Sequence, residues 1–395
     1  MIYLFTTNFP YGKGETFLET EISFLSDKSE VTIIPLFISG DKREIPVNVR
    51  VAKPLLSFNP KSKGKLIKAG ICNFSPLFFA FSEFCRKKVF LSNTKIWNFS
   101  TSLLLFRAIF KNIKINFSGN DILYFYWADK SALILPFLKK KNAFKSVVRF
   151  HGSDLYEAAK GGYIPFREQI FKAIDTACPI SENGANYLRE KYNNKAPKEI
   201  IVSRLGVLKQ GENPENNSEV FHLLSCSNVI PLKRVHLIAK VLQHIDFQIK
   251  WTHIGDGVGF EKLKKEVENL PKNVEVNLLG SMPNEDVMQF YRENPIDLFI
   301  NVSESEGIPV SMMEVLSFGI PAMATNVGGV SEIVDQYVGT LLDKDITLPD
   351  LADKIKWFYQ LPDKQKFREA AYKKWNDMYN ADKNYKLFVE ILSEL

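Results

Sequence analysis

The sequence predicts an α/β protein made of two doubly wound, Rossmann-like domains that face each other across a cleft. At 395 residues the chain is too long for one ordinary core, and two domains of about 150–200 residues are expected. Short β-rich runs alternate with helical segments, the pattern of parallel sheets covered by helices. The alternation stops at a polar segment, residues 206–220, and then resumes. Because such sheets bind ligands beyond the carboxyl ends of their strands, we expect the site in the cleft.

Five β-rich runs mark the strands expected in the first half. They are short and rich in β-branched and aromatic residues. They lie at residues 1–7, 30–37, 121–127, 145–150 and 198–205. Helices are expected between them, including 15–27 and 181–193, the second with Ser181 as its N-cap. Residues 1–205 therefore form the expected N-terminal domain.

The second half repeats the alternation. Strands are expected at 221–229, 248–255, 274–280, 297–303, 321–326 and 338–343. Helices are expected at 233–245, 260–270 and 284–294, after Pro309, and in succession from 348 to 395. We expect 206–375 to form the second domain and 376–395 to be a C-terminal helix that packs back on the first.

The net charge of +6 is unevenly distributed. Residues 51–150 hold 18 basic residues against 3 acidic ones, interleaved with aromatic and aliphatic side chains. Basic amphipathic helices suit an anionic membrane surface, which predicts a cytoplasmic protein bound peripherally to the inner face of the cell membrane. Nucleic acid is not the expected partner, because no recognition motif accompanies the charge. A solvated basic face over an ordinary core remains the alternative.

Two glutamates, Glu306 and Glu314, stand out in the stretch from 301 to 334. The predicted strand before them ends at Ser303, and Pro309 fits the first turn of the following helix. Glu306 then lies on the loop, Glu314 lies about a turn and a half into the helix, and the N–H groups of 307–311 form an anion-binding helix start. The two carboxylates can accept hydrogen bonds from the hydroxyls of a sugar and a ribose. A cap and a solvated helix residue are the alternative on spacing alone.

The stretch "ESEGIPVSMMEVLSFGIPAMATNVGGVSEIV" resembles the signature of the retaining, family-4 nucleotide-sugar glycosyltransferases, which have the GT-B fold. "ETFLETEI" near the N-terminus is similar to members that build surface polysaccharides. The resemblance implies that Glu306 contacts the hydroxyls of the donor sugar and that Glu314 holds the nucleotide ribose. It also implies that the N–H groups of Gly307 and Ile308 contact the sugar.

Further segments of the second half are similar to the same family. "SCSNVIPLKRV" resembles a segment in which an Arg and a Lys clamp the pyrophosphate, and Lys233 matches the Lys. The Arg position is occupied by Asn228, which removes one charge-assisted hydrogen bond. Arg234 or Arg204 is a candidate to replace it, and a weaker affinity for the donor is the alternative. The segment "LLGSMPNEDVMQFY", which begins in the strand expected at 274–280, resembles the family's base-binding segment. This resemblance implies base contacts from Gly280, Ser281 and Met282.

Two segments of the first half are candidates for the same site. Gly12 and Gly14 follow the first strand, and their backbone N–H groups are expected to approach a phosphate or the acceptor. His151 directly follows a strand, at the place where related enzymes keep a His near the donor sugar. Arg149 and Asp154 flank it as further candidates.

The resemblance implies transfer of a glycosyl unit from a UDP- or GDP-sugar to a saccharide or a polyprenyl-diphosphate-linked acceptor. No cofactor and no metal are expected, because cationic side chains and backbone dipoles would stabilise the leaving diphosphate. Glu306, His151 and Lys233 are the candidate catalytic residues. A nucleotide-sugar epimerase of the same fold is one alternative. A non-catalytic subunit that binds the nucleotide sugar is another, prompted by Asn228.

Overall fold

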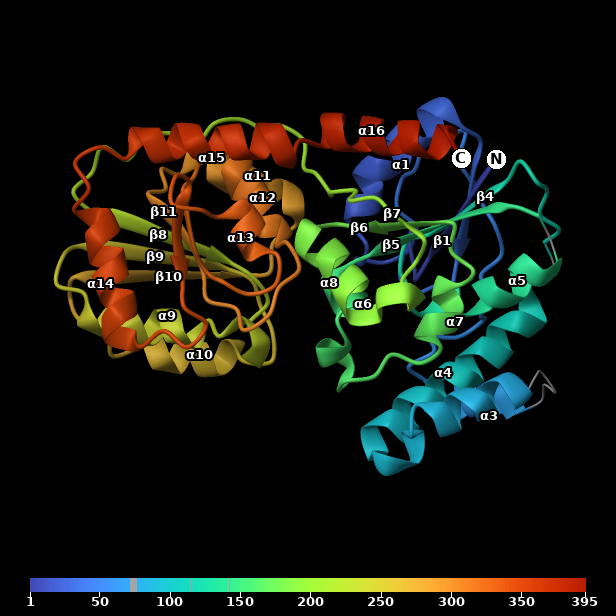
Figure 1. Ribbon diagram of the computed structural model, residues 1–395. Helices are drawn as coiled ribbons and strands as arrows, with labels where there is room; N and C mark the ends of the chain where they lie inside the picture. Colours follow the sequence, from blue (N-terminus) through green and yellow to red (C-terminus); the bar gives the residue numbers. More distant parts are fainter. Residues whose placement is uncertain (72–76, 114, 142) are drawn as a thin grey trace. The chain divides into compact units, whose positions relative to one another are not determined.

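The computed structural model describes residues 1–71, 77–113, 115–141 and 143–395 (Figure 1). The chain divides into two compact units. The N-terminal unit contains Met1–Leu205 and Tyr385–Leu395, and the C-terminal unit contains Gly206–Asn384. Each unit has one parallel sheet with helices on both faces, so the predicted fold class of two doubly wound α/β units is confirmed.

The sheet of the N-terminal unit has seven parallel strands in the order β3-β2-β1-β4-β5-β6-β7. They are β1 (Ile2–Thr6), β2 (Val31–Pro35), β3 (Arg50–Val51), β4 (Ile122–Phe125), β5 (Lys145–Phe150), β6 (Thr176–Pro179) and β7 (Glu199–Ile200). Two of them were not predicted: β3 pairs through two residues only, and β6 is a four-residue run that ends in a proline. The strand expected at 198–205 is reduced to Glu199–Ile200.

The helices of the N-terminal unit connect these parallel strands. They are α1 (Phe17–Lys28), α2 (Lys63–Ile71), α3 (Leu77–Arg86), η1 (Val89–Leu91), α4 (Asn93–Asn112), η2 (Lys130–Ile134), α5 (Leu135–Lys141), α6 (Gly152–Leu155), η3 (Glu157–Lys160), α7 (Arg167–Phe171), α8 (Glu182–Tyr192) and η4 (Asn193–Lys195). The Ser181 hydroxyl accepts a hydrogen bond from the Gly184 N–H, which confirms it as the N-cap of α8.

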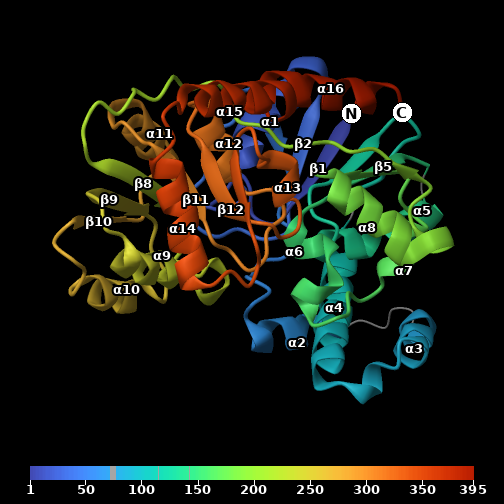
Figure 2. The same cartoon turned by 60° about the vertical axis from the view of Figure 1, so that its left-hand side comes forward.

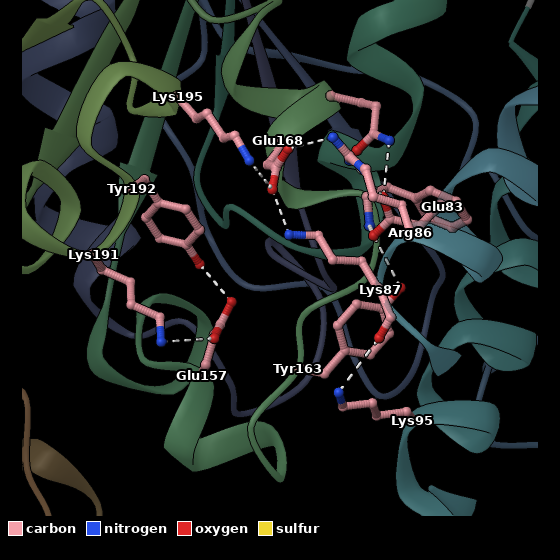
Figure 3. A network of polar contacts seen from close by, with 12 residues as sticks. Glu83, Arg86, Lys87, Lys95, Glu157, Tyr163, Glu168, Lys191, Tyr192 and Lys195 are labelled. Atoms are coloured by element: carbon pink, nitrogen blue, oxygen red, sulfur yellow. Dashed lines mark hydrogen bonds and ion pairs between the residues drawn. The ribbon is translucent and has the colours of Figure 1, made fainter. Parts of the chain in front are cut away.

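A helical segment formed by α2, α3 and α4 extends from the N-terminal unit (Figure 2). α4 packs on α2, where a Cβ at Gly70 would lie 2.6 Å from a methyl group of Leu104. α3 is tied to α7 by a network of ion pairs around Glu168 (Figure 3). The Arg86 guanidinium lies 2.7 Å from the Glu168 carboxylate, and Lys87 contacts the same group. The segment is therefore anchored to the body of the unit.

The C-terminal unit has six parallel strands in the order β10-β9-β8-β11-β12-β13. They are β8 (Phe221–Cys226), β9 (Ile249–Ile254), β10 (Val274–Gly280), β11 (Leu298–Asn301), β12 (Ala322–Thr325) and β13 (Gly339–Leu342), all at predicted positions. The helices are η5 (Pro231–Lys233), α9 (His236–Val241), η6 (Leu242–His244), α10 (Phe260–Val267), α11 (Asn284–Glu293), α12 (Val310–Ser317), α13 (Val330–Ile333), α14 (Leu348–Tyr359) and α15 (Gln365–Met378).

The last helix, α16 (Ala381–Ser393), begins in the C-terminal unit and belongs to the N-terminal unit from Tyr385 onwards. Phe388, Val389 and Leu392 are buried there in the same cluster as side chains of α1 and β1. In the described ranges no helix combines the length and the apolar character that crossing a membrane requires.

Candidate functional site

The order of strands defines one switch point in each sheet. In the C-terminal unit, β8 is the first strand in the sequence and lies between β9 and β11. From β8 the chain continues to β9 on one side, and from β11 it continues to β12 on the other. Doubly wound sheets bind ligands in the crevice at the carboxyl ends of two such neighbouring strands. The loop after β8 carries Lys233, and the loop after β11 carries Glu306. The Glu304 N–H donates to the Leu232 carbonyl at 2.8 Å, which joins the two loops.

Lys233 and Glu306 form an ion pair at this switch point. The Lys233 Nζ lies 2.5 Å from the Glu306 Oε1, and the Glu306 side chain is only 9% exposed. The Asn301 amide donates to the same oxygen at 3.3 Å, while its own Oδ1 accepts from the Ser303 N–H at 2.9 Å. Asn301 was not predicted as a site residue. Its position at the end of an apolar strand is the signal that could have identified it.

The Arg234 side chain makes hydrogen bonds to the backbone of neighbouring loops. The residue does not extend a helix: η5 ends at Lys233, Arg234 is left-handed with φ 48°, and α9 begins only at His236. This interrupts the helix that was predicted over 233–245. The Arg234 Nε donates to the Val302 carbonyl at 2.7 Å, and its Nη1 donates to the Lys344 carbonyl at 2.8 Å. These donors hold three loops together, so the Arg234 guanidinium is already engaged and a role on a phosphate stays a prediction.

The backbone of Gly307 and Ile308 lies between Glu306 and α12. The Gly329 N–H donates to the Gly307 carbonyl at 2.9 Å. A Cβ at Gly328, which has φ 56°, would lie 1.8 Å from the Glu306 carbonyl oxygen, so the Gly-Gly pair is required for this close approach. Within the described ranges the N–H groups of Gly307 and Ile308 have no acceptor. Gly307 is partly exposed, whereas Ile308 is 5% exposed.

Glu314 is the fifth residue of α12, and Pro309 is the residue that precedes the helix. The Asn284 amide, at the start of α11, donates to the Glu314 Oε1 at 2.7 Å. Burial raises the pKa of the Glu314 carboxyl to about 7, and the hydrogen bond from Asn284 opposes this shift. Asn284 therefore links Glu314 to the segment that was predicted to contact the base.

That base segment connects β10 to α11. Gly280 ends β10 with φ 70°, and its carbonyl accepts from the Gly255 N–H at 2.7 Å. Ser281 is exposed and Met282 is partly buried. The Asn228 side chain is exposed on the loop after β8, and in the described part of the chain it makes no hydrogen bond to Lys233 or Glu306. The roles of these four residues stay predictions.

The N-terminal unit has an equivalent switch point between β1 and β4. His151, at the end of β5, is 6% exposed, and neither ring nitrogen has a hydrogen-bond partner among the residues that the structure describes. Its ring lies 4.3 Å from that of Trp127 and 4.8 Å from that of Tyr126. Burial and the nearby Arg149 charge lower the pKa of His151 well below its ordinary value. The lowered pKa favours the neutral imidazole, whose two buried ring nitrogens lack a hydrogen-bond partner in the described part of the chain.

Glu15, which was not predicted, occupies the loop after β1. Its carboxylate accepts from the N–H groups of Thr7, Asn8 and Phe9 at 2.7–2.8 Å and from the Trp127 indole at 2.6 Å. Its backbone is left-handed, with φ 58°. The successive N–H groups form an anion-binding nest, and Glu15 fills it. A glutamate within a glycine-containing loop after a strand was the available signal.

The two glycines of the same loop are less available than expected. Gly12 has φ 67°, and its N–H donates to the Asp41 carbonyl at 2.9 Å. The Gly14 carbonyl accepts from the Arg43 Nη2 at 2.5 Å, and Gly14 itself is exposed. The expectation that both N–H groups approach a ligand therefore needs correction for Gly12, because its donor is already used.

Arg149 and Asp154 have structural surroundings. The Arg149 side chain is fully buried and pairs with Glu21 of α1 at 3.1 Å. The Asp154 carboxylate accepts from the His151 N–H at 2.7 Å and the Ala128 N–H at 2.6 Å, which fixes the loops after β5 and β4. Burial and the Asp129 charge raise the pKa of Asp154 to about 7. Asp154 therefore positions His151 through its backbone N–H, whereas Arg149 ties β5 to α1 through Glu21.

Comparison with known proteins identifies similar chains. Residues 209–374 match the family of glycosyl transferases group 1. The uncharacterized glycosyltransferase MJ1178 of Methanocaldococcus jannaschii is 32% identical over 252 residues, which are 62% of this chain and 67% of the relative. The O-antigen biosynthesis glycosyltransferase WbnH of Escherichia coli is 27% identical over 231 residues, which are 58% of this chain and 64% of the relative. The match thus spans about two thirds of these relatives' own lengths.

A solved structure supports the fold over the whole chain. The HepE protein of Anabaena, solved in complex with UDP, has a TM-score of 0.66 at 15% identity and covers 100% of both chains. At this identity the likeness concerns the fold.

Proposed function

The chain belongs to the group 1 glycosyltransferases, and from that premise we propose that it transfers a glycosyl unit from a nucleotide-diphosphate sugar to an acceptor hydroxyl with retention of configuration. The observation that carries the proposal is the Lys233–Glu306 pair at the switch point of the C-terminal sheet. The N–H groups of Gly307 and Ile308, which have no acceptor within the described ranges, and the partly buried Glu314 follow along the chain. Together they supply a cation, two donors and two carboxylates.

Lys233 would stabilise the charge that develops on the leaving diphosphate. Its ammonium has three donors, so it can keep Glu306 and still bind a phosphate oxygen. Glu306 would hold hydroxyls of the donor sugar, and Glu314 those of the ribose. Because Glu306 already accepts from Lys233 and Asn301, it is a weak nucleophile. We therefore favour a same-face route in which the leaving phosphate helps to deprotonate the acceptor, without a metal or other cofactor.

The finer assignments rest on the N-terminal unit and on the relatives. We assign His151 to the donor sugar, because its ring nitrogens, which lack a hydrogen-bond partner in the described part of the chain, can bind hydroxyls. We assign residues 1–205 to the acceptor. The relative WbnH is named for O-antigen biosynthesis, and HepE was solved with UDP. These names favour a UDP-sugar donor and a role in surface polysaccharide synthesis on the cytoplasmic face of the membrane.

The nucleotide is tested by the melting temperature of the protein with UDP, GDP, ADP and dTDP. One nucleotide is expected to raise it, because a ligand that binds only the native state stabilises that state. The sugar donor of that nucleotide is then incubated with and without saccharide acceptors. Production of an epimer from the donor alone would favour the epimerase alternative. Binding without any turnover across donors and acceptors would favour a non-catalytic subunit.

Nucleotide affinity is expected to depend on pH through Glu314. Its pKa of about 7 means that the carboxylate is mostly ionised at pH 8 and mostly protonated at pH 6. Ribose hydroxyls donate to the ionised form, so the Kd should be about tenfold weaker at pH 6 than at pH 8. Calorimetric titration of UDP at both pH values measures the change. Glu314→Gln should bind weakly at both. An equally steep pH dependence in Glu314→Gln would assign the effect to another group.

A further inference from the structure

The N-terminal unit contains a pocket of about 650 Å³ beside α4, which adjoins the His151 site through Ala128 and Asp129. Its walls come from α2, α4, η2 and the segment 160–165. The volume is in the range of pockets that hold small molecules, about 300–1,000 Å³. The walls are mainly apolar, with Leu66, Trp97, Leu104, Leu133 and Ile164 among them. Such walls offer few partners to the hydroxyls of a saccharide.

Lysines surround this apolar pocket. Lys61, Lys63, Lys130 and Lys160 all line it, and Asp129 is the acidic residue among its lining residues. Lys160 is paired with Asp129 at 3.5 Å, and the Lys63 Nζ lies over the Trp97 ring at 4.6 Å. Neither Lys61 nor Lys130 has a carboxylate partner in the described part of the chain. Within the described ranges, Lys61, Lys63 and Lys130 therefore line the pocket without a carboxylate partner.

Lys130 is held in a strained conformation. Its φ of 45° is left-handed, a conformation that costs a non-glycine residue free energy. It is the first residue of η2 and is partly buried. Lys130 thus lines an apolar pocket without a carboxylate partner among the residues that the structure describes.

The helical segment formed by α2, α3 and α4 also carries exposed apolar side chains. Ile67, Ile71, Phe81, Phe90, Leu91, Ile96 and Trp97 all belong to the stretch 67–97 and are between 38% and 69% exposed. Lysines alternate with them along the sequence. Exposed apolar residues interspersed with lysines suit a membrane interface, where the apolar side chains can insert and the lysines can face anionic headgroups.

We propose that this pocket binds the polyprenyl chain and the diphosphate of a lipid-linked acceptor. The apolar walls accept the chain, and Lys61, Lys63 and Lys130 bind the diphosphate, which carries several negative charges on adjacent phosphates. The helical segment around the pocket lies against the bilayer from which the lipid enters. The identity of the bound lipid as the acceptor rests on the proposed glycosyltransferase function, whereas its binding does not.

The test is a binding titration that needs no transfer activity. Geranylgeranyl diphosphate is added to the purified full-length protein, and the fluorescence of Trp97, which lines the pocket, is followed. Geranylgeraniol, inorganic pyrophosphate and phosphatidylglycerol vesicles are titrated in parallel, with Trp97→Phe to identify the signal. We expect the diphosphate lipid to bind at least about tenfold more tightly than the alcohol or pyrophosphate, because only it satisfies both the walls and the lysines.

Matched variants locate the binding. Lys130→Gln removes one of the positive charges that line the pocket, and Ser102→Phe places a large side chain in the pocket volume. Each should weaken geranylgeranyl diphosphate about tenfold or more, on the scale of one charge-assisted hydrogen bond. Lys68→Gln and Ser82→Phe change exposed residues of α2 and α3 that do not line the pocket, and they should bind like wild type. Melting temperatures verify that all four variants are folded.

Several outcomes would overturn the proposal. Equal affinity for geranylgeraniol would show an apolar site without a diphosphate, and equal affinity for pyrophosphate would show an anion site without a chain. If phosphatidylglycerol vesicles compete fully with geranylgeranyl diphosphate, the segment is a general membrane-binding surface and not a specific lipid site. Unchanged binding in both pocket variants would place the ligand elsewhere. If the protein binds the diphosphate lipid but none of the nucleotides, the proposed function is refuted while the assignment of this pocket stands.

Discussion

Replacing Lys233 by methionine is expected to lower kcat by about 10²–10³-fold, the usual loss when one preorganised donor to a developing negative charge is removed. The side chain keeps its length and loses its charge. Glu306 retains the hydrogen bond from Asn301 at 3.3 Å, so its buried carboxylate is not left without a partner and the loop should keep its form. The measurement is the steady-state rate of transfer from the nucleotide sugar identified by thermal shift.

Lys240→Met is the matched control, because Lys240 is an exposed residue of α9 and pairs with no residue of the site. It should retain wild-type kcat. Glu306→Gln should also lower turnover, and the double variant should lose less than the product of the two single losses, since the residues act as a pair. A kcat of Lys233→Met within about threefold of wild type would exclude this lysine from stabilisation of the transition state.

Replacing Glu21 by alanine is expected to lower the free energy of unfolding by about 3–5 kcal/mol, because it leaves the buried Arg149 without its charged partner. Both side chains are 0% exposed, and the Arg149 Nη2 lies 3.1 Å from the Glu21 Oε1. The Tyr124 hydroxyl donates to the same carboxylate at 2.7 Å, so alanine would also remove its acceptor. Urea denaturation, followed by far-ultraviolet circular dichroism, measures the loss as a shift in midpoint.

Glu19→Ala provides the control within the same helix. Glu19 is 48% exposed and pairs with Arg43 at 2.7 Å, so its loss should cost no more than about 1 kcal/mol. If Glu21→Ala and Glu19→Ala have the same urea midpoint, the buried Glu21–Arg149 pair contributes no more to the free energy of unfolding than the exposed pair, and the prediction is wrong. This second prediction concerns stability alone, so it is independent of the proposed reaction.

The sequence identified most of the C-terminal unit correctly, for a reason that lies in its strands. The strands are short, each contains several apolar residues, and most are separated by a helical segment, so the alternation of the two patterns marks them. The loop that carries Glu306 and the helix that carries Glu314 follow from a strand end and a proline. The N-terminal unit was harder, because β3 has only two residues and β6 only four, and both form through pairing with neighbouring strands.

What the sequence by itself determined is therefore the class of fold, the succession of elements in the C-terminal unit, and the residue types that its loops present. The tertiary structure alone decided which donors are already occupied. The Trp127 indole reaches Glu15 across 112 residues, and Arg234 reaches the Lys344 carbonyl across 110. The lysine-lined pocket likewise brings together α2, α4, η2 and 160–165. Periodicity and turn chemistry are local, whereas these contacts depend on how distant segments pack, which no short stretch of sequence encodes.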